Sequence, residues 1–302
     1  MIKPLSLIAG DSIGIVTTAR KIDPIELKAA VKIFTKWKLQ VKLAPHLYDQ
    51  YHQFGGTDEV RLQNFQTMLD NPEIRAIVCA RGGYGTIRIL DKINFTRFLE
   101  NPKWIVGFSD VTVIHSYLQE VLDVCSIHAT MPIDFPADAS ENNAIKSLKQ
   151  TLFGLPLQYE FPAHHLNRLG TMEGVIVGGN LSILASLMGS PNELDTRNKI
   201  LFIEDLDEYL YHIDRMMMNL KRCGMLNQLL GLIVGGMINM KDNKVPFGLD
   251  AYEIIADAIK DYNYPVCYDF PAGHIDENMA LILGEKANLQ IDKKRVVFKQ
   301  KS

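Results

Sequence analysis

Two short apolar runs, each followed by a loop and a helical pattern, constrain the fold of this chain most strongly. Residues 76–80 (AIVCA) and 104–107 (WIVG) contain no polar residue. An unbroken apolar run of this length, without alternation, is typical of a parallel strand that is buried on both faces. Strand and helix patterns alternate in the same way from the N-terminus, at residues 13–16, 24–34, 41–43, 58–69 and 86–90. This alternation predicts a parallel α/β sheet that binds its ligands at the carboxyl ends of the strands.

The length of 302 residues predicts two domains. The pattern becomes irregular after about residue 134, where the turn-rich stretches 134–140 (DFPADAS) and 161–165 (FPAHH) occur. We therefore expect an N-terminal α/β domain over 1–135, a linker over 136–170 and a C-terminal domain over 171–302. In the last domain we expect strands at 174–177, 200–203, 232–234 and 266–270, helices at 181–188, 210–222 and 252–259, and a closing hairpin at 289–298.

The composition excludes several classes of function. The net charge is −3, and no lysine or arginine cluster is dense enough for a nucleic-acid surface. The longest apolar run, 229–240, is interrupted by three glycines and is too short to span a bilayer, so we expect no membrane partner. The four cysteines are far apart and no metal-binding motif occurs, so we expect reduced thiols, no metal and no cofactor. We expect a cytoplasmic protein.

The stretch 104–112 (WIVGFSDVT) combines a strand, a glycine turn and the start of a helix, with Ser109 at the bend. A strand that turns sharply into a helix exposes the first side chain after the turn and directs free N–H groups at a bound ligand. Ser109 is therefore a candidate nucleophile. The alternative is that Ser109 or Asp110 only caps the helix that follows, since both residue types are common N-caps.

The glycine-rich loop Arg81-Gly82-Gly83-Tyr84-Gly85 follows the strand at 76–80. It does not match a dinucleotide-binding motif, because Arg88 stands where the third glycine is required. The loop is either a tight turn that needs positive φ or a cradle of backbone amides for a negatively charged oxygen. An acyl-transfer enzyme needs such a cradle beside its serine.

A serine nucleophile also needs a base and a group that orients the base. Among eight histidines, His274 follows a strand and a Pro-Ala-Gly turn, where functional residues concentrate. Glu204 and Asp205 follow the strand at 200–203, and either could cap the next turn or orient another side chain.

The chain resembles the LD-carboxypeptidase family, serine peptidase family S66, over essentially its whole length. The resemblance rests on six short motifs in the family's order: 10–16 (GDSIGIV), 81–85 (RGGYG), 107–112 (GFSDVT), 178–182 (GGNLS), 202–205 (FIED) and 272–274 (AGH), the last followed by Asn278.

The resemblance implies a catalytic triad in which Ser109 is the nucleophile, His274 the general base and acid, and Glu204 the residue that orients the histidine. It also implies an oxyanion hole formed by the backbone N–H groups of Gly83 and Asp110. The family's fold is a Rossmann-like N-terminal domain followed by a C-terminal domain with a small barrel-like sheet and helices, assembled as a homodimer.

We further expect Arg81, Gly82, Tyr84 and Asn180 to contact the substrate. Arg81 is a candidate partner for a terminal carboxylate, with a purely structural arginine as the alternative.

Two members of the family suggest different substrates. One is an L,D-carboxypeptidase that releases terminal D-alanine from murein tetrapeptides during cell-wall peptide recycling. The other is a microcin C immunity peptidase that cleaves peptidyl- or aminoacyl-nucleotides. A third possibility from the residues alone is a non-enzymatic α/β binding module in which Ser109 only caps a helix.

Overall fold

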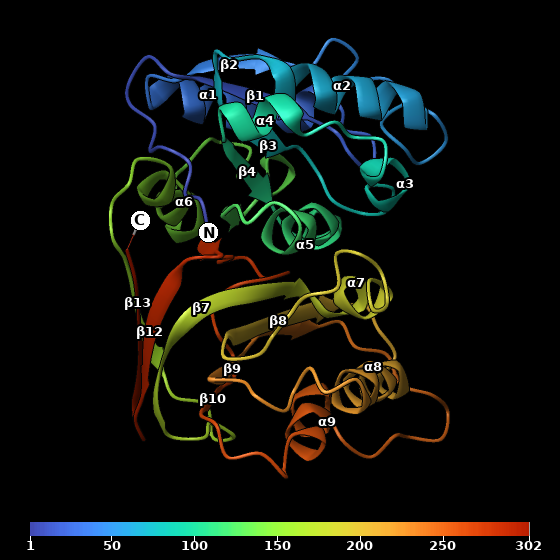
Figure 1. The fold of residues 1–302 in the computed structure, drawn as a ribbon, viewed down its shortest axis with the longest axis vertical. Helices are drawn as coiled ribbons and strands as arrows, with labels where there is room; N and C mark the ends of the chain where they lie inside the picture. Colours follow the sequence, from blue (N-terminus) through green and yellow to red (C-terminus); the bar gives the residue numbers. More distant parts are fainter. Residues whose placement is uncertain (302) are drawn as a thin grey trace.

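The computed structural model describes residues 1–301 and arranges them around two sheets. Figure 1 shows the N-terminal half of the chain at one end of the molecule's long axis and most of the C-terminal half at the other. Helices α5 and α7 meet at the boundary between the two halves (Figure 1).

The first sheet is the Rossmann-like parallel sheet that the sequence predicted. Its strand order is β11-β5-β4-β3-β1-β2, and the strands β1 to β5 from the N-terminal half run parallel to one another. The strands are β1 (Ser12–Val16), β2 (Gln40–Leu43), β3 (Ile74–Cys79), β4 (Trp104–Gly107), β5 (Ser126–His128) and β11 (Leu281–Leu283). All residues of β4 and nearly all of β3 are buried, as their unbroken apolar sequences require.

Helices cover this sheet and connect its strands. They are α1 (Pro24–Lys36), α2 (Asp58–Asp70), α3 (Ile87–Leu90), α4 (Thr96–Glu100), α5 (Thr112–Glu120) and α6 (Asn143–Leu152). At the start of α1 the backbone N–H of Asp23 donates to the Glu26 carboxylate at 2.8 Å, and Pro24 occupies the first helical position.

The second sheet is mixed, with strand order β10-β9-β8-β7-β12-β13-β6. Strands β7 to β10 run parallel, whereas β12, β13 and β6 follow β7 in the sheet, each antiparallel to its neighbour. The strands are β6 (Leu157–Pro162), β7 (Gly170–Asn180), β8 (Ile200–Leu206), β9 (Gly231–Ile238), β10 (Val266–Cys267), β12 (Lys286–Ile291) and β13 (Arg295–Gln300). The helices of this half are α7 (Leu181–Ser186), α8 (Leu210–Arg222) and α9 (Ala251–Ala258).

One strand from the C-terminal half of the chain joins the first sheet. The C-terminal β11 pairs antiparallel with β5 of the first sheet, with Leu281 opposite His128. The stretch 136–170, which the sequence assigned to a linker, contains α6 and contributes β6 to the edge of the second sheet. The segment that follows His274 is therefore anchored in the same sheet that carries Ser109.

Candidate active site

Ser109 lies in a strained turn directly after β4. Its φ of +62° is in the left-handed region, which is uncommon for a residue with a side chain and unfavourable by about 1–2 kcal/mol. Ser109 begins a short 3₁₀ helix, η1 (Ser109–Val111), that leads into α5, and neither helix has a side-chain cap hydrogen bond. The capping interpretation of Ser109 and Asp110 is therefore wrong, and the strain is of the kind found at functional sites.

The glycine-rich loop packs against Ser109. A Cβ atom on Gly82 would lie 2.9 Å from the Cβ and 3.0 Å from the Oγ of Ser109, so only glycine leaves room for the serine. Among residues 1–301, no hydrogen bond uses the backbone N–H of Gly83 or of Asp110. Both predicted oxyanion donors are thus available to a ligand.

A buried carboxylate holds the loop in place. The Asp110 side chain accepts a hydrogen bond from the backbone N–H of Thr86 at 2.8 Å, and the hydroxyl of Thr86 donates to that of Thr18 at 2.9 Å. Burial raises the pKa of Asp110, although its hydrogen bonds with Thr86 lower it. The turn that carries Ser109 and the loop after β3 are therefore joined by direct hydrogen bonds.

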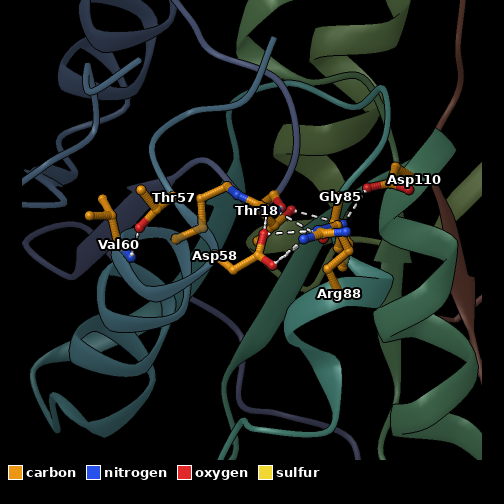
Figure 2. A network of polar contacts seen from close by, with 9 residues as sticks. Thr18, Thr57, Asp58, Val60, Gly85, Arg88 and Asp110 are labelled. Carbon is orange, nitrogen blue, oxygen red and sulfur yellow. Dashed lines mark hydrogen bonds and ion pairs between the residues drawn. The ribbon is translucent and has the colours of Figure 1, made fainter. Parts of the chain in front are cut away.

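Figure 2 shows the wider polar network around this loop. Inside it, the buried guanidinium of Arg61 donates to the carbonyl oxygens of Gly85 at 2.9 Å and Thr18 at 2.5 Å, and forms an ion pair with Asp58. Asp58 also binds Arg88, at 2.7 Å (Figure 2). Because each peptide unit is planar, fixing these carbonyl oxygens also fixes the direction of the N–H groups in the same peptide units.

Glu204 and His274 form the second half of the site. Glu204 is fully buried near the end of β8, and its Oε2 atom accepts hydrogen bonds from His274 Nδ1 at 2.6 Å and from the His274 backbone N–H at 3.2 Å. Because Nδ1 donates to the carboxylate, Nε2 is the nitrogen that can take up a proton. A Cβ atom on Gly273, whose φ is +106°, would lie within 2.8 Å of Glu204 side-chain atoms, so this close approach requires glycine.

The surroundings of His274 favour its protonated form. Burial alone would lower its pKa, but the adjacent Glu204 carboxylate and the nearby Asp205 and Asp134 outweigh burial and raise the pKa above its ordinary value. A histidine that is oriented and charge-stabilised by a buried carboxylate is suited to act first as a base and then as an acid.

Other histidines near the boundary do not compete for this role. His115 is fully buried, its Nε2–H donates to the carbonyl of Gly107 at 2.9 Å, and burial lowers its pKa to about 4. His128 is also fully buried, and its ring packs against Phe108 and Phe202 with centroids 5.7 and 4.9 Å apart.

Ser109 and His274 line the same cavity, which has a volume of about 570 Å³. The ring of Phe108 packs on that of His274, with centroids 4.7 Å apart. The other lining residues come from both halves of the chain and are Arg20, Arg81, Gly82, Gly83, Phe108, Met131, Ile133, Asp134, Leu206, Asp207 and Glu208. A second cavity of about 470 Å³ shares His274 with the first and extends toward Asn278.

Of the four residues expected to contact the substrate, two line the cavity and two do not. Arg81 and Gly82 line the cavity, and Arg81 lies 3.8 Å from Glu26. Tyr84 is not a lining residue and points to solvent with 47% of its surface exposed. Asn180 is buried, and its Nδ2 donates to Asp205 at 2.9 Å while its Oδ1 accepts the N–H of Ile183 at the start of α7.

Several lining residues were not singled out in the sequence. Arg20 follows β1, and Asp207 and Glu208 follow β8, so all three lie beyond the carboxyl ends of parallel strands. That position is the signal that would have identified them. Glu208 is held by His212, whose Nδ1 lies 2.5 Å from its Oε2.

Residues 1–301 contain neither a metal-binding cluster nor a helix that could span a membrane. No group of three or more histidine, cysteine, aspartate or glutamate side chains is arranged to hold a metal ion. No helix is both long enough and apolar enough to cross a membrane.

Comparisons with known proteins identify relatives of this chain over nearly its whole length. Family models described as the LD-carboxypeptidase N-terminal and C-terminal domains match residues 13–129 and 173–289. A probable murein peptide carboxypeptidase of Bacillus subtilis is 34% identical over 299 residues, with 98% of this chain and 94% of the relative covered. The murein tetrapeptide carboxypeptidase of Pseudomonas aeruginosa is 27% identical, with 92% of each chain covered.

Solved structures show the same fold. The muramoyltetrapeptide carboxypeptidase of Oxalobacter formigenes superposes with a TM-score of 0.87 at 24% identity, covering 96% of this chain and 99% of that one. The microcin C7 self-immunity protein MccF, solved with glutamyl sulfamoyl guanosine, also has a TM-score of 0.87, at 20% identity and with 99% and 98% covered. The chain thus belongs to the LD-carboxypeptidase family, peptidase family S66, and is a hydrolase that acts on peptide bonds.

Proposed function

We propose that the protein is a serine-type L,D-carboxypeptidase that releases the terminal D-alanine from murein tetrapeptides. The observation that carries the proposal is the Glu204–His274 pair, which meets the strained Ser109 at one cavity. Relatives from Bacillus subtilis and Pseudomonas aeruginosa that are named for murein peptides support the choice of substrate.

In the first half of the reaction, the Oγ of Ser109 attacks the carbonyl carbon that precedes the terminal D-alanine. Nε2 of His274 takes the hydroxyl proton, and Glu204 keeps Nδ1 protonated and stabilises the imidazolium. The backbone N–H groups of Gly83 and Asp110 donate to the carbonyl oxygen as it becomes an anion. In other hydrolases one such donor contributes roughly 100- to 1000-fold in turnover.

In the second half, the bond between the carbonyl carbon and the nitrogen of D-alanine breaks. His274 gives its proton to that nitrogen, and the remaining tripeptide stays bound to Ser109 as an ester. His274 then takes a proton from water, whose oxygen attacks the ester carbonyl, and Ser109 is released with its proton restored. No metal or cofactor is required by these steps.

The direct test is to incubate the protein with murein tri-, tetra- and pentapeptides and to measure the product masses. We expect D-alanine and the tripeptide from the tetrapeptide alone. Release of D-alanine from the pentapeptide, or no reaction with any of the three peptides, would contradict the proposal.

The immunity-type function is the alternative within the same family, and relatives named MccF support it. Stacking of a nucleobase requires an exposed aromatic platform. Both tryptophans, Trp37 and Trp104, are buried, and the part of the chain that the structure describes places only Phe108 and His274 as aromatic rings around the two cavities. We therefore expect no turnover of an aminoacyl sulfamoyl nucleotide added to the same panel.

The proposal also includes the oligomeric state and the cellular location of the protein. We expect a homodimer, which light scattering coupled to gel filtration measures directly. We expect the protein to work in the cytoplasm, consistent with cysteines that are all free and, except for Cys223, buried. Cell fractionation with an antibody to the protein tests this location.

A further inference from the structure

Arg20 occupies an unusual position at the active-site cavity. Its backbone N–H donates to the carbonyl oxygen of Gly82 at 3.3 Å, so its main chain is fixed to the glycine-rich loop. A Cβ atom on Gly83 would lie 2.5, 2.6 and 3.0 Å from the Cγ, Cδ and Nε atoms of Arg20. The stem of this arginine therefore lies directly across Gly83, one of the two proposed oxyanion donors.

The guanidinium group of Arg20 has no partner within residues 1–301. No hydrogen bond or ion pair involves its side-chain nitrogens, although the side chain lines the cavity and is exposed. Arg81, the arginine that the sequence favoured for a carboxylate, lies 3.8 Å from Glu26 and donates to the carbonyl of Lys21 at 3.4 Å. Arg20 is thus the lining arginine whose donors remain available to a ligand.

Acidic side chains restrict where a carboxylate can lie in this cavity. Asp134, Asp207 and Glu208 also line the cavity and would repel a negatively charged group. The planar guanidinium of an arginine matches a carboxylate with two parallel hydrogen bonds and is stronger than a neutral donor. The terminal carboxylate of a peptide substrate is therefore directed toward Arg20.

The covalent geometry of a peptide substrate supports the same placement of its carboxylate. In a peptide whose last residue is to be released, the terminal carboxylate carbon is three bonds from the carbonyl carbon that Ser109 attacks. Its receptor must therefore lie beside the oxyanion donors. Arg20, which crosses Gly83, meets this requirement.

We propose that Arg20 binds the free α-carboxylate of the substrate's last residue and thereby restricts the enzyme to terminal residues. This inference rests on the proposed carboxypeptidase function and adds to it a residue that selects the substrate. It predicts that the enzyme discriminates against peptides whose terminal carboxylate is neutralised.

The test compares a murein tetrapeptide with the same peptide carrying a C-terminal amide. For the free acid, we expect kcat/KM of R20Q to fall about 10- to 100-fold, mainly through KM, because a charge-assisted hydrogen bond is lost. For the amide, R20Q and the wild type should react at similar rates. R20K should restore part of the preference for the acid, and R222Q, which alters an exposed arginine at the end of α8, should behave as the wild type.

Binding measurements separate this inference from the proposed function. In an S109A background, calorimetry gives the affinity for acid and amide peptides without any turnover, and R20Q should remove the preference for the acid. A preference that survives R20Q in both assays, or one that R81Q removes instead, would overturn the role of Arg20. Failure of the wild type to release D-alanine would contradict the carboxypeptidase function, while the binding comparison would still decide the role of Arg20.

Discussion

The backbone N–H of Asn180 donates a hydrogen bond to the hydroxyl of Thr112 at 3.1 Å, across the boundary between the two sheets. Thr112 begins α5, three residues after Ser109, and Asn180 ends β7 opposite Glu204 of β8. A Cβ atom on Gly179 would lie 2.6 Å from the Thr112 hydroxyl, so the contact also depends on glycine. This hydrogen bond links the start of α5, next to the proposed nucleophile, to β7, the neighbour of the strand β8 that carries Glu204.

Replacement of Thr112 by valine tests that link. The variant keeps the shape of the side chain but leaves the buried N–H of Asn180 without an acceptor, which destabilises a protein by about 1–3 kcal/mol. We expect a lower unfolding temperature and a kcat reduced about tenfold, with little change in KM. The T112S variant keeps the hydroxyl and should restore kcat. A T112V enzyme with unchanged kcat would show that the link does not position the catalytic groups.

The Glu204–His274 pair predicts a specific change in the pH profile. A general base must be deprotonated, so kcat/KM should rise as the pH increases through the pKa of His274, which its carboxylate neighbours raise above the ordinary value. In E204Q the main stabilising charge is absent, so the acid limb of the profile should move to lower pH. The plateau should fall roughly 100- to 10,000-fold, because the imidazolium is no longer stabilised. An acid limb that stays in place would mean that another group controls it.

Gly82 offers a test of how closely the loop must approach the serine. A methyl group there would lie 3.0 Å from the Oγ of Ser109, so G82A should displace the hydroxyl. A shift of about 1 Å at a reacting atom can reduce turnover about 100-fold. We expect kcat to fall by that amount while the unfolding temperature changes little. Wild-type turnover in G82A would contradict the packing of the loop against the serine.

The backbone strain at Ser109 predicts an order of stability among variants without the hydroxyl. Its φ of +62° suits glycine better than alanine. We therefore expect S109G to be more stable than S109A by about 1 kcal/mol in urea unfolding, with both variants inactive. Equal stability, or a more stable S109A, would show that the turn is not strained.

Much of the fold is visible in the sequence because local patterns determine individual elements. The apolar spacing of Ile213, Met216, Met217 and Leu220 indicated a helix over 210–222, and those four side chains are buried in α8. The partners of short strands are not encoded locally. Leu281–Leu283 is apolar enough to join either sheet, and its place beside β5 depends on how the whole chain packs. Strand β6 was missed for the same reason, because its neighbours lie far away in the sequence.

The sequence singled out Ser109, Glu204 and His274 by their expected places at strand ends and by family motifs. The structure brings Ser109 and His274 to one cavity and joins Glu204 to His274 by a hydrogen bond, while their catalytic roles stay a prediction. The expectation for Asn180 rested on a motif alone, and its hydrogen bonds to Asp205 and α7 become visible only in the folded chain. Arg20 lies in none of the six motifs. Its position across Gly83 depends on contacts between segments that are distant in the sequence, so local patterns could not predict it.

We propose that Ser109 attacks the peptide bond before a terminal D-alanine. The most direct measurement is the rate at which wild-type and S109A proteins release D-alanine from a murein tetrapeptide, followed by mass spectrometry. We expect S109A to retain its fold, as judged by circular dichroism, and to lose at least roughly 1000-fold of the activity. Undiminished release of D-alanine by a folded S109A protein would contradict the role of Ser109 as the nucleophile.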